Sequence, residues 1–212
     1  MEKLAIFDID YTITKKETLI EFFKFIVKKD IKNIIYLPRA IFCGLMYLIK
    51  VYDERKVKET FLKFIDSIDE DKLAELTKDF YENVIQKILY NDAIEMMKKL
   101  KKEGCLIYLI SASPEFYIKE FYNIKEVDEV IGTRFEFKDK IFKRKMYGNN
   151  CKGEEKVLRL KEVLVKKNMN VDFKQSYMFS DSLSDKPLLD LVGNAYLINY
   201  KKNSGFKVLQ WK

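Results

Sequence analysis

Short apolar runs alternate with longer amphipathic stretches along most of the chain. The apolar runs have the length of buried strands, and they cover residues 4–7, 105–110, 177–180 and 195–198, with a shorter one near 129–133. Apolar residues at helical spacing lie between them, at residues 92–103, 114–122, 153–167 and 185–191. Gly104 ends the first of these helices. Strands that alternate with helices predict an α/β fold, in which helices flank both faces of a parallel sheet.

The stretch between the first and second strands departs from this alternation. ETLIEFFKFIVKK, residues 17–29, and DKLAELTKDFYENVIQKIL, residues 71–89, have apolar residues at helical spacing. We therefore expect residues 15–90 to form a small helical cap domain, inserted after the first strand. Residues 1–14 and 91–212 would then form the core domain, with a hairpin across 134–146.

The most apolar part of this insertion is IIYLPRAIFCGLMYLI, residues 34–49. It is too short to predict a membrane span, and Pro38 and Arg39 lie within it. We expect a buried cap helix or an interfacial patch here, and membrane association is not the expected state, although lipid contact stays open. Acidic and lysine residues follow Met1 directly, which predicts no signal peptide and a cytoplasmic protein.

Polar side chains follow three of the predicted strands. Asp8 follows LAIF, Ser111 follows LIYLI and Asp181 follows YMFS. Because the carboxyl ends of parallel strands lie along one edge of a sheet, these groups are expected to converge. Asp10 lies two residues after Asp8, and two buried carboxylates repel each other unless a cation or a proton lies nearby. Carboxylate oxygens suit a hard divalent cation, so a metal site is predicted at this edge.

Composition narrows the chemistry that this edge can perform. The chain has no histidine, which excludes histidine-activated serine and cysteine nucleophiles and most zinc sites. Cys43, Cys105 and Cys151 are far apart in the sequence, which argues against a disulfide framework and suits a reducing compartment. The formal charge of +7, from 40 Lys and Arg against 33 Asp and Glu, is spread along the chain. This distribution favours a solvated lysine-rich surface over nucleic-acid binding.

Four motifs resemble those of one known family. DIDYT (8–12), LISAS (109–113), CKGEEK (151–156) and SDSLSD (180–185) resemble, in order and spacing, the motifs of the haloacid dehalogenase-like (HAD) phosphohydrolases. The resemblance covers essentially the whole chain, and ISASPEF and CKGEEK look most like the phosphoserine phosphatase branch. It implies a Rossmann-like core with a cap of the family's first type. The implied activity is Mg²⁺-dependent hydrolysis of a small-molecule phosphate ester through an aspartyl-phosphate.

The resemblance also implies roles for the acidic residues. Asp8 would be the nucleophile, and Asp10 would protonate the leaving alcohol and later activate water. Asp8, Asp181 and the backbone carbonyl of Asp10 would hold Mg²⁺. Asp185 would steady the water shell of the metal or a nearby lysine, or it caps the following helix. Positive charge and positioning of this kind are what phosphoryl transfer requires.

The remaining motif residues have alternative interpretations. Ser111, with Ala112 and the amides at the next helix start, would bind a phosphate oxygen, or Ser111 is an ordinary helix cap. Thr12 would orient the first loop, or it forms only a local turn. Two lysines one helical turn apart could neutralise the phosphate. Lys152 fits the KGE form of the third motif and Lys156 fits the GxxK form, and we favour Lys156.

The substrate is less closely defined. Glu17, in KKETLIEF, is similar to the phosphoserine phosphatase glutamate that holds the substrate ammonium, although it could be only a helix N-terminal charge. Tyr11 replaces the small residue of the family, and SAS replaces a glycine-rich second motif. Arg39 or Arg55 could hold a substrate carboxylate, but neither lies in a matching motif. The apolar cap favours a lipid or amphiphilic phosphate, and a non-catalytic module that binds a phosphorylated ligand is a third hypothesis.

Overall fold

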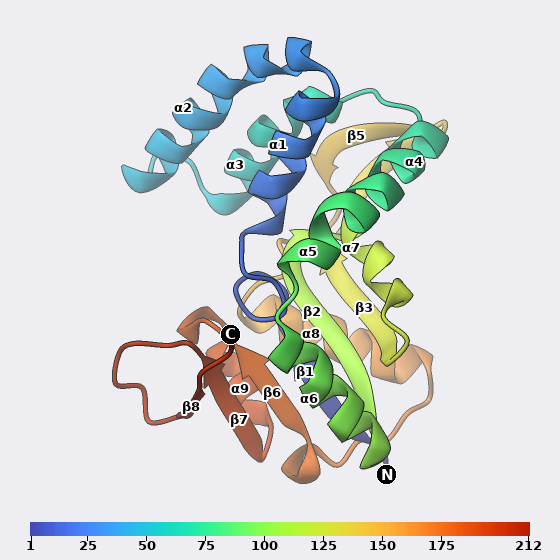
Figure 1. Ribbon diagram of the computed structural model, residues 1–212, viewed down its shortest axis with the longest axis vertical. Coiled ribbons are helices and arrows are strands. Elements are labelled where there is room, and N and C mark those ends of the chain that lie inside the picture. The colour runs from blue at the N-terminus through green and yellow to red at the C-terminus, as the bar shows by residue number, and fades with distance from the viewer.

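A six-stranded parallel sheet forms the centre of the computed structural model, which describes residues 1–212 (Figure 1). The strand order is β3-β2-β1-β6-β7-β8. The strands are β1 (Lys3–Phe7), β2 (Cys105–Pro114), β3 (Val127–Thr133), β6 (Tyr177–Ser180), β7 (Asn194–Ile198) and β8 (Lys207–Leu209). The predicted α/β fold with a parallel sheet is therefore confirmed.

The first strand lies between β2 and β6. Phe7 pairs with Leu109 of β2 on one side and with Phe179 of β6 on the other. The rings of Phe7 and Phe179 stack with centroids 4.5 Å apart. Both strands are buried on both faces, which explains why their sequences are continuous apolar runs rather than alternating ones. This register brings the carboxyl ends of β1, β2 and β6 to the same edge.

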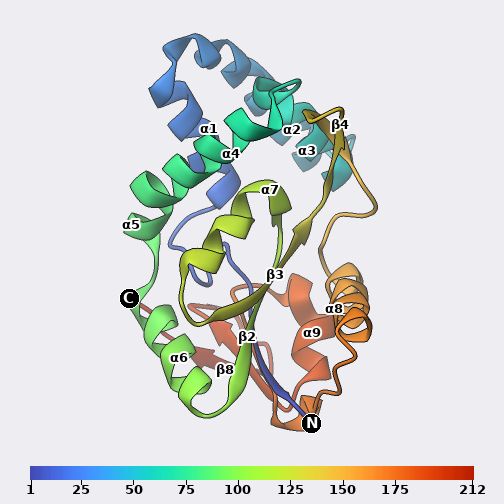
Figure 2. The ribbon, with the colours of Figure 1, turned by 90° about the vertical axis from the view of Figure 1, so that its right-hand side faces the viewer.

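Helices cover both faces of the sheet (Figure 2). The helices are α6 (Asn91–Lys102) on one face, and α8 (Glu154–Lys166) and α9 (Lys186–Leu191) on the other. Ala5 and Phe7 belong to the same apolar cluster as Met97 of α6. Leu4 and Ile6 belong to the cluster of α8 and α9. The alternation of side chains along β1 thus divides the core into two layers.

The second part of the molecule is helical and lies beyond the carboxyl edge of the sheet (Figure 1). It contains α1 (Thr18–Lys29), α2 (Leu37–Leu48), α3 (Glu54–Phe61), α4 (Glu70–Phe80) and α5 (Gln86–Ile88), with a π-helical turn at Tyr81–Ile85. The chain enters and leaves this part side by side, because Thr14 pairs with Leu89 in an antiparallel bridge. The domain boundaries at residues 15 and 90 stay predictions.

The predicted hairpin is present as β4 (Phe135–Lys138) and β5 (Ile141–Met146). Although it belongs to the later part of the sequence, it packs with the inserted helices. The Met146 amide donates to the Glu59 carboxylate of α3 over 3.0 Å. The ring centroids of Phe142 and Phe116 are 5.0 Å apart. The hairpin therefore connects α3 to the region that follows β2.

Several element boundaries differ from the sequence prediction. β2 continues to Pro114 through a register shift, so Ser111 lies within the strand's extension rather than just after it. The helix predicted at 114–122 is one α-helical turn, α7 (Glu115–Ile118), followed by a 3-10 helix at Lys119–Asn123. Sequence patterns did not reveal the short strand β8. The remaining 3-10 helices are Ile31–Tyr36, Leu62–Ile65, Phe173–Gln175 and Leu183–Asp185.

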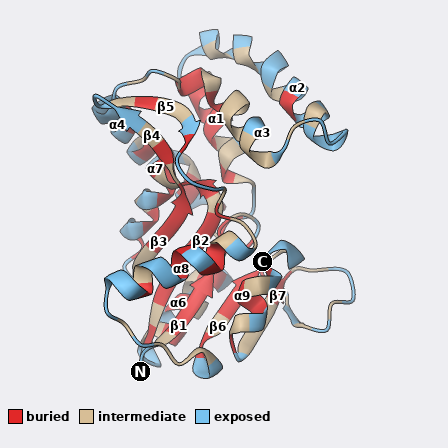
Figure 3. Cartoon of the chain, turned by 180° about the vertical axis from the view of Figure 1, so that it is seen from behind, coloured by how far each residue is buried: buried red, intermediate tan, exposed pale blue.

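The apolar segment of the insertion is exposed. It forms the 3-10 helix Ile31–Tyr36 and α2, and Cys43 is its only buried residue. Figure 3 shows α2 at the end of the molecule, with exposed residues along most of its length. The expectation of a buried cap helix is therefore wrong, because no other element covers the outer side of this helix. The interfacial patch is the alternative that agrees with this exposure.

The Phe22 ring joins the inserted helices to the core, and its removal should destabilise the protein. Its centroid lies 5.0 Å from Phe80 of α4 and 5.4 Å from Tyr117 of α7, and the residue is fully buried. We expect Phe22→Ala to lower the free energy of unfolding by about 4 kcal/mol, because it leaves a cavity. The matched variant Phe42→Ala removes a residue that is 46% exposed. It should lower the free energy of unfolding by less than about 1 kcal/mol. Urea denaturation measures both, and equal losses would contradict this assignment.

Candidate active site

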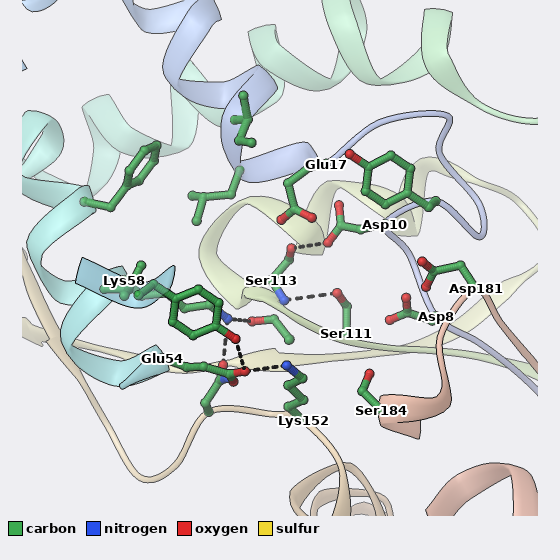
Figure 4. A pocket seen from close by; sticks show the side chains of 18 of the residues that line it. Asp8, Asp10, Glu17, Glu54, Lys58, Ser111, Ser113, Lys152, Asp181 and Ser184 are labelled. Carbon is green, nitrogen blue, oxygen red and sulfur yellow. Dashed lines mark hydrogen bonds and ion pairs between the residues drawn. The ribbon is translucent and has the colours of Figure 1, made fainter. Parts of the chain in front are cut away.

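The loop after β1 positions the two aspartates differently (Figure 4). The Asp8 amide donates to the Phe179 carbonyl over 2.9 Å, which continues the sheet pairing by one residue. The chain then turns, and the amides of Thr12, Ile13 and Thr14 all lie within 3.2 Å of the Ile9 carbonyl. Tyr11 has a φ of 55°, a left-handed conformation that favours glycine. This tight turn separates Asp8 from Asp10.

A buried ion triad contains Asp8. The Lys156 Nζ atom, on the first turn of α8, lies 2.7 Å from Asp8 Oδ1 and 2.7 Å from Asp185 Oδ2. The Lys156 side chain is only 2% exposed. Burial by itself would lower the pKa of Lys156, but the Asp8 and Asp185 carboxylates raise it above its usual value. The lysine is therefore a fixed positive charge beside Asp8.

The other candidate lysine lies elsewhere. Lys152 forms an ion pair with Glu54 of α3, and the Glu54 carboxylate also accepts a hydrogen bond from Tyr47 over 3.1 Å. Lys152 lines the same pocket as Asp8 but has no contact with it. The structure thus brings Lys156, and not Lys152, to the first aspartate.

Both carboxylate oxygens of Asp10 accept short hydrogen bonds. The backbone amide of Thr18, in the first turn of α1, donates to Oδ1 over 2.6 Å. The Ser113 hydroxyl donates to Oδ2 over 2.6 Å. The Thr18 hydroxyl in turn lies 3.0 Å from the Tyr117 hydroxyl. Asp10 is therefore held between the start of α1 and the last residues of β2.

Thr12 connects the first loop to the last motif. Its buried hydroxyl oxygen accepts the hydrogen bond of the Asp181 amide over 2.8 Å. This contact is between residues far apart in the sequence, so Thr12 does more than form a local turn. Burial and the neighbouring Asp185 carboxylate raise the pKa of Asp181 to about 6.

The donor groups at this edge fit a divalent cation. Four carboxylates, those of Asp8, Asp10, Asp181 and Asp185, gather around the single buried ammonium of Lys156. Burial and the three neighbouring carboxylates raise the pKa of Asp8 well above its usual value, against the effect of Lys156. Asp185 Oδ1 is buried without a hydrogen-bond partner. An excess of negative charge with a free oxygen suits Mg²⁺.

The carboxylates alone do not enclose an ion. No three acidic or cysteine side chains form a group that could hold a metal by themselves. Mg²⁺ commonly retains several waters and binds proteins through one or two carboxylates. The arrangement is therefore compatible with a hydrated ion at Asp8 and Asp181, rather than with a closed protein cage.

The second motif makes one local contact and several with distant parts of the chain. The Ser111 hydroxyl oxygen accepts the Ser113 amide over 3.0 Å, which leaves the Ser111 hydroxyl hydrogen free to donate. The Ala112 carbonyl accepts hydrogen bonds from Lys58 Nζ and from the Thr133 hydroxyl, each over 2.6 Å. Ser111 thus combines a cap-like contact with a free donor at the pocket wall.

A polar network that sequence reasoning missed connects α3 to Asn150, the residue before the third motif. Lys58 Nζ donates to Asn150 Oδ1 over 2.6 Å, and Asn150 Nδ2 donates to Glu54 over 2.6 Å. Burial lowers the pKa of Lys58 to about 8. The available signal was the position of Lys58 on α3, one residue after Val57 and three before Phe61, both of which line the pocket. A lysine on the apolar face of a helix is a candidate for an internal contact.

The pocket between α1, α2, α3 and the sheet edge has a volume of about 560 Å³. Glu17, the N-cap residue of α1, points into it beside Asp10 (Figure 4). Burial, followed by the Asp10 charge, raises the pKa of Glu17 to about 7. The apolar part of the wall includes Leu19, Ile20, Cys43, Val57 and Phe61.

Neither arginine that the sequence offered lines this pocket. Arg39 is exposed on α2. The Arg55 guanidinium donates to the Met146 carbonyl over 3.2 Å and to the Gly148 carbonyl. Lys58 and Lys152 are thus the cations nearest the cap side of the pocket.

Comparison with known proteins agrees with this arrangement. The sequence profile of one family, haloacid dehalogenase-like hydrolase, matches residues 5–190. The chain is 24% identical over 201 residues to the phosphoserine phosphatase SerB1 of Mycobacterium tuberculosis. That similarity covers 92% of this chain and 64% of the relative. The chain therefore spans just under two thirds of the length of that curated relative.

Two solved structures share the fold. A Bordetella pertussis protein of unknown function has a TM-score of 0.89 and 21% identity, and the match covers 99% of this chain and 98% of that one. A substrate-bound phosphoserine phosphatase has a TM-score of 0.64 and 14% identity, with 95% and 88% of the two chains covered. At these identities the structures establish the fold alone, and they confirm the helix-flanked parallel sheet.

The buried ion triad provides a test that separates the two lysines. Lys156→Met would leave Asp8 and Asp185 without their cation, so we expect it to lower the free energy of unfolding by about 3 kcal/mol. Lys152→Met removes a half-exposed ion pair and should cost less than about 1 kcal/mol. Both are measured by urea denaturation with EDTA present. Similar losses for the two variants would contradict the assigned geometry.

Proposed function

Because the chain belongs to the haloacid dehalogenase-like hydrolase family, we propose that it is a Mg²⁺-dependent phosphomonoester hydrolase that acts through an aspartyl-phosphate. The observation that carries this proposal is the position of Asp8, at the carboxyl edge of the sheet, beside Lys156 and in one pocket with Asp10 and Asp181. A nucleophile, a fixed cation and a second carboxylate in one cleft are the groups that phosphoryl transfer through an enzyme carboxylate requires.

In the first step, an oxygen of the Asp8 carboxylate attacks phosphorus, and the bond from phosphorus to the alcohol oxygen breaks. The protonated Asp10 side chain gives its proton to the leaving alcohol. Lys156 favours the ionised form of Asp8 and lies where negative charge develops on the phosphoryl oxygens. The hydrogen bonds from Thr18 and Ser113 keep the Asp10 carboxylate oriented.

In the second step, water replaces the enzyme carboxylate. Asp10, now ionised, takes a proton from a water molecule, whose oxygen attacks phosphorus and releases Asp8 and inorganic phosphate. The free hydroxyl hydrogen of Ser111 donates to a phosphoryl oxygen in both steps. Asp8, Asp181 and the Asp10 carbonyl would hold Mg²⁺, with Asp185 next to it. When bound, the ion supplies additional positive charge to the phosphoryl oxygens.

Phosphoserine is the first substrate that we propose. Glu17 and Lys58 are opposite charges in the part of the pocket beyond the aspartates. A carboxylate for the substrate ammonium and an ammonium for its carboxylate would match a small zwitterion. Lys58 uses two of its donors on Ala112 and Asn150, so one remains for a ligand.

An amphiphilic phosphate ester is the second candidate. The wall formed by Leu19, Ile20, Cys43, Val57 and Phe61 is apolar, and a small zwitterion has no group that would cover it. A hydrocarbon chain would bury this surface and gain hydrophobic free energy. The apolar wall therefore favours esters of longer alcohols for the same phosphate site.

The nucleophile is tested by Asp8→Asn. We expect this variant to lose p-nitrophenyl phosphate hydrolysis by at least about 10³-fold, because an amide cannot attack phosphorus. The control Asp190→Asn changes a half-exposed aspartate on α9 and should retain activity. EDTA should abolish the native activity, and Mg²⁺ should restore it. Turnover by a folded Asp8→Asn variant, verified by circular dichroism, would exclude Asp8 as the nucleophile.

The substrate class is tested by the pH dependence of KM. Because Glu17 has a pKa of about 7, it gains negative charge as the pH rises from about 6 to about 7, while Lys58, with a pKa of about 8, still keeps most of its positive charge. The KM for phosphoserine should therefore fall across this range by up to about tenfold relative to the KM for octyl phosphate. Octyl phosphate has the same phosphate group but no ammonium, so it controls for titration of the phosphate. Glu17→Gln should remove this relative shift and leave the octyl phosphate profile unchanged. The proposed binding of the substrate ammonium by Glu17 would be contradicted if the KM for phosphoserine fell relative to that for octyl phosphate in Glu17→Gln as well. It would also be contradicted if the native enzyme showed no such fall.

A further inference from the structure

An unpartnered apolar face lies on the outer side of the inserted helices. We propose that this face, which we call the outer face, docks on the surface of an anionic lipid bilayer. Its residues share helical spacing and substantial exposure to solvent, and they are Ile34, Leu37, Ile41, Leu45 and Leu48. Ile35, Ile49 and Val51 extend it beyond the helix. Isolated exposed apolar residues are common on soluble proteins, but a contiguous set on one element marks an interaction site.

α2 has two apolar sides, one that lines the pocket and one that faces solvent. Ala40, Gly44 and Tyr47 recur at helical spacing and line the pocket. Ile41, Leu45 and Leu48 recur in the same way, displaced by one residue, and face solvent. A helix on the surface of a soluble protein normally has polar residues on its solvent side. The apolar residues of the outer face therefore need an explanation other than the pocket.

The charges around the outer face favour an anionic surface. No acidic residue lies between Asp30 and Asp53, whereas Lys32, Arg39 and Lys50 are all exposed within this interval. Apolar residues combined with basic ones are typical of helices that lie in the interface of anionic membranes. Contact between two copies of this chain through the outer face would bring these like charges together, which is unfavourable.

The geometry favours a helix that lies along the membrane rather than across it. Ile31–Leu48 is long and apolar enough to span a bilayer, and only 6% of it is buried within the molecule. However, α1 and α3, which flank the segment, pack against each other through Phe23 and Phe61, whose ring centroids are 5.6 Å apart. A spanning segment would place α1 and α3 on opposite sides. Figure 1 shows α2 at the end of the molecule farthest from the sheet, where it can meet a flat surface.

Docking would have a consequence for the pocket. Ile20 and Tyr47 both line the pocket and are exposed, by 47% and 44%. They therefore lie at its entrance, next to the outer face. A docked molecule would present this entrance to amphiphilic esters in the bilayer. That consequence rests on the proposed function, whereas docking itself does not.

The proposal is tested by flotation of the full chain with vesicles. The vesicles are phosphatidylcholine alone, or phosphatidylcholine mixed with phosphatidylglycerol. We expect binding to the mixed vesicles, weakened by high salt, and little binding to phosphatidylcholine. Leu45→Gln with Leu48→Gln should weaken binding on the order of tenfold. The matched control is Leu158→Gln with Val165→Gln on α8, whose residues are 55% and 80% exposed against 53% and 76%.

Neither double variant alters a residue of the catalytic site, so both should hydrolyse p-nitrophenyl phosphate like the native chain. Docking is supported if Leu45→Gln with Leu48→Gln retains hydrolysis but no longer floats with the mixed vesicles. If the native chain hydrolyses no ester, the proposed function fails, but flotation still tests docking. Equal binding to the two kinds of vesicle, or equal loss in the two double variants, would overturn the proposal. Sedimentation velocity tests self-association. If the native chain is a dimer and Leu45→Gln with Leu48→Gln is a monomer, the outer face is a self-association surface, and the proposal is overturned.

Discussion

The ammonium group of Lys156, buried between the carboxylates of Asp8 and Asp185, is the interaction on which the site depends. It lies 2.7 Å from an oxygen of each. Without it, the carboxylate of Asp8 at the end of β1 and that of Asp185 at the start of α9 would be buried together with no compensating charge. That would lower the free energy of unfolding, which is small in any protein. The contact also fixes the first turn of α8 against the end of β1. One charge thus stabilises the carboxyl edge of the sheet and, in the proposed mechanism, would keep Asp8 ionised for attack.

Around this triad, the inserted helices complete the cleft by polar contacts. The Thr18 amide of α1 donates to Asp10, and Lys58 of α3 donates to the Ala112 carbonyl in the last part of β2. Glu54 of α3 contacts both Asn150 and Lys152. The chain enters and leaves the insertion at one place, where Thr14 pairs with Leu89. The Lys58 and Glu54 contacts therefore join the insertion to the wall of the pocket at a second place.

The sequence was informative where one local pattern determines the structure. Apolar runs predicted β1, β2, β6 and β7, and polar residues at strand ends predicted the convergence of Asp8, Ser111 and Asp181. The motif forms favoured Lys156, which meets Asp8, but no local pattern predicted that Lys152 pairs with Glu54, because that contact depends on where α3 lies. Lys58 was missed because an isolated lysine in an amphipathic helix has no distinctive neighbours. Apolarity could not decide between a buried helix and an interfacial patch for α2, because it indicates what a segment tends to contact and not whether the fold supplies a partner.

In the proposed mechanism, Asp8 carries the phosphoryl group during turnover. The Asp10→Asn variant, which cannot activate water, should accumulate the phosphorylated enzyme when mixed with an activated ester such as p-nitrophenyl phosphate. Acid quenching, reduction of the acyl phosphate with borohydride and peptide mass spectrometry would locate the modified residue. The account predicts modification of Asp8 alone. Modification of another residue, or release of phosphate by the native enzyme with no modified aspartate in either protein, would contradict it.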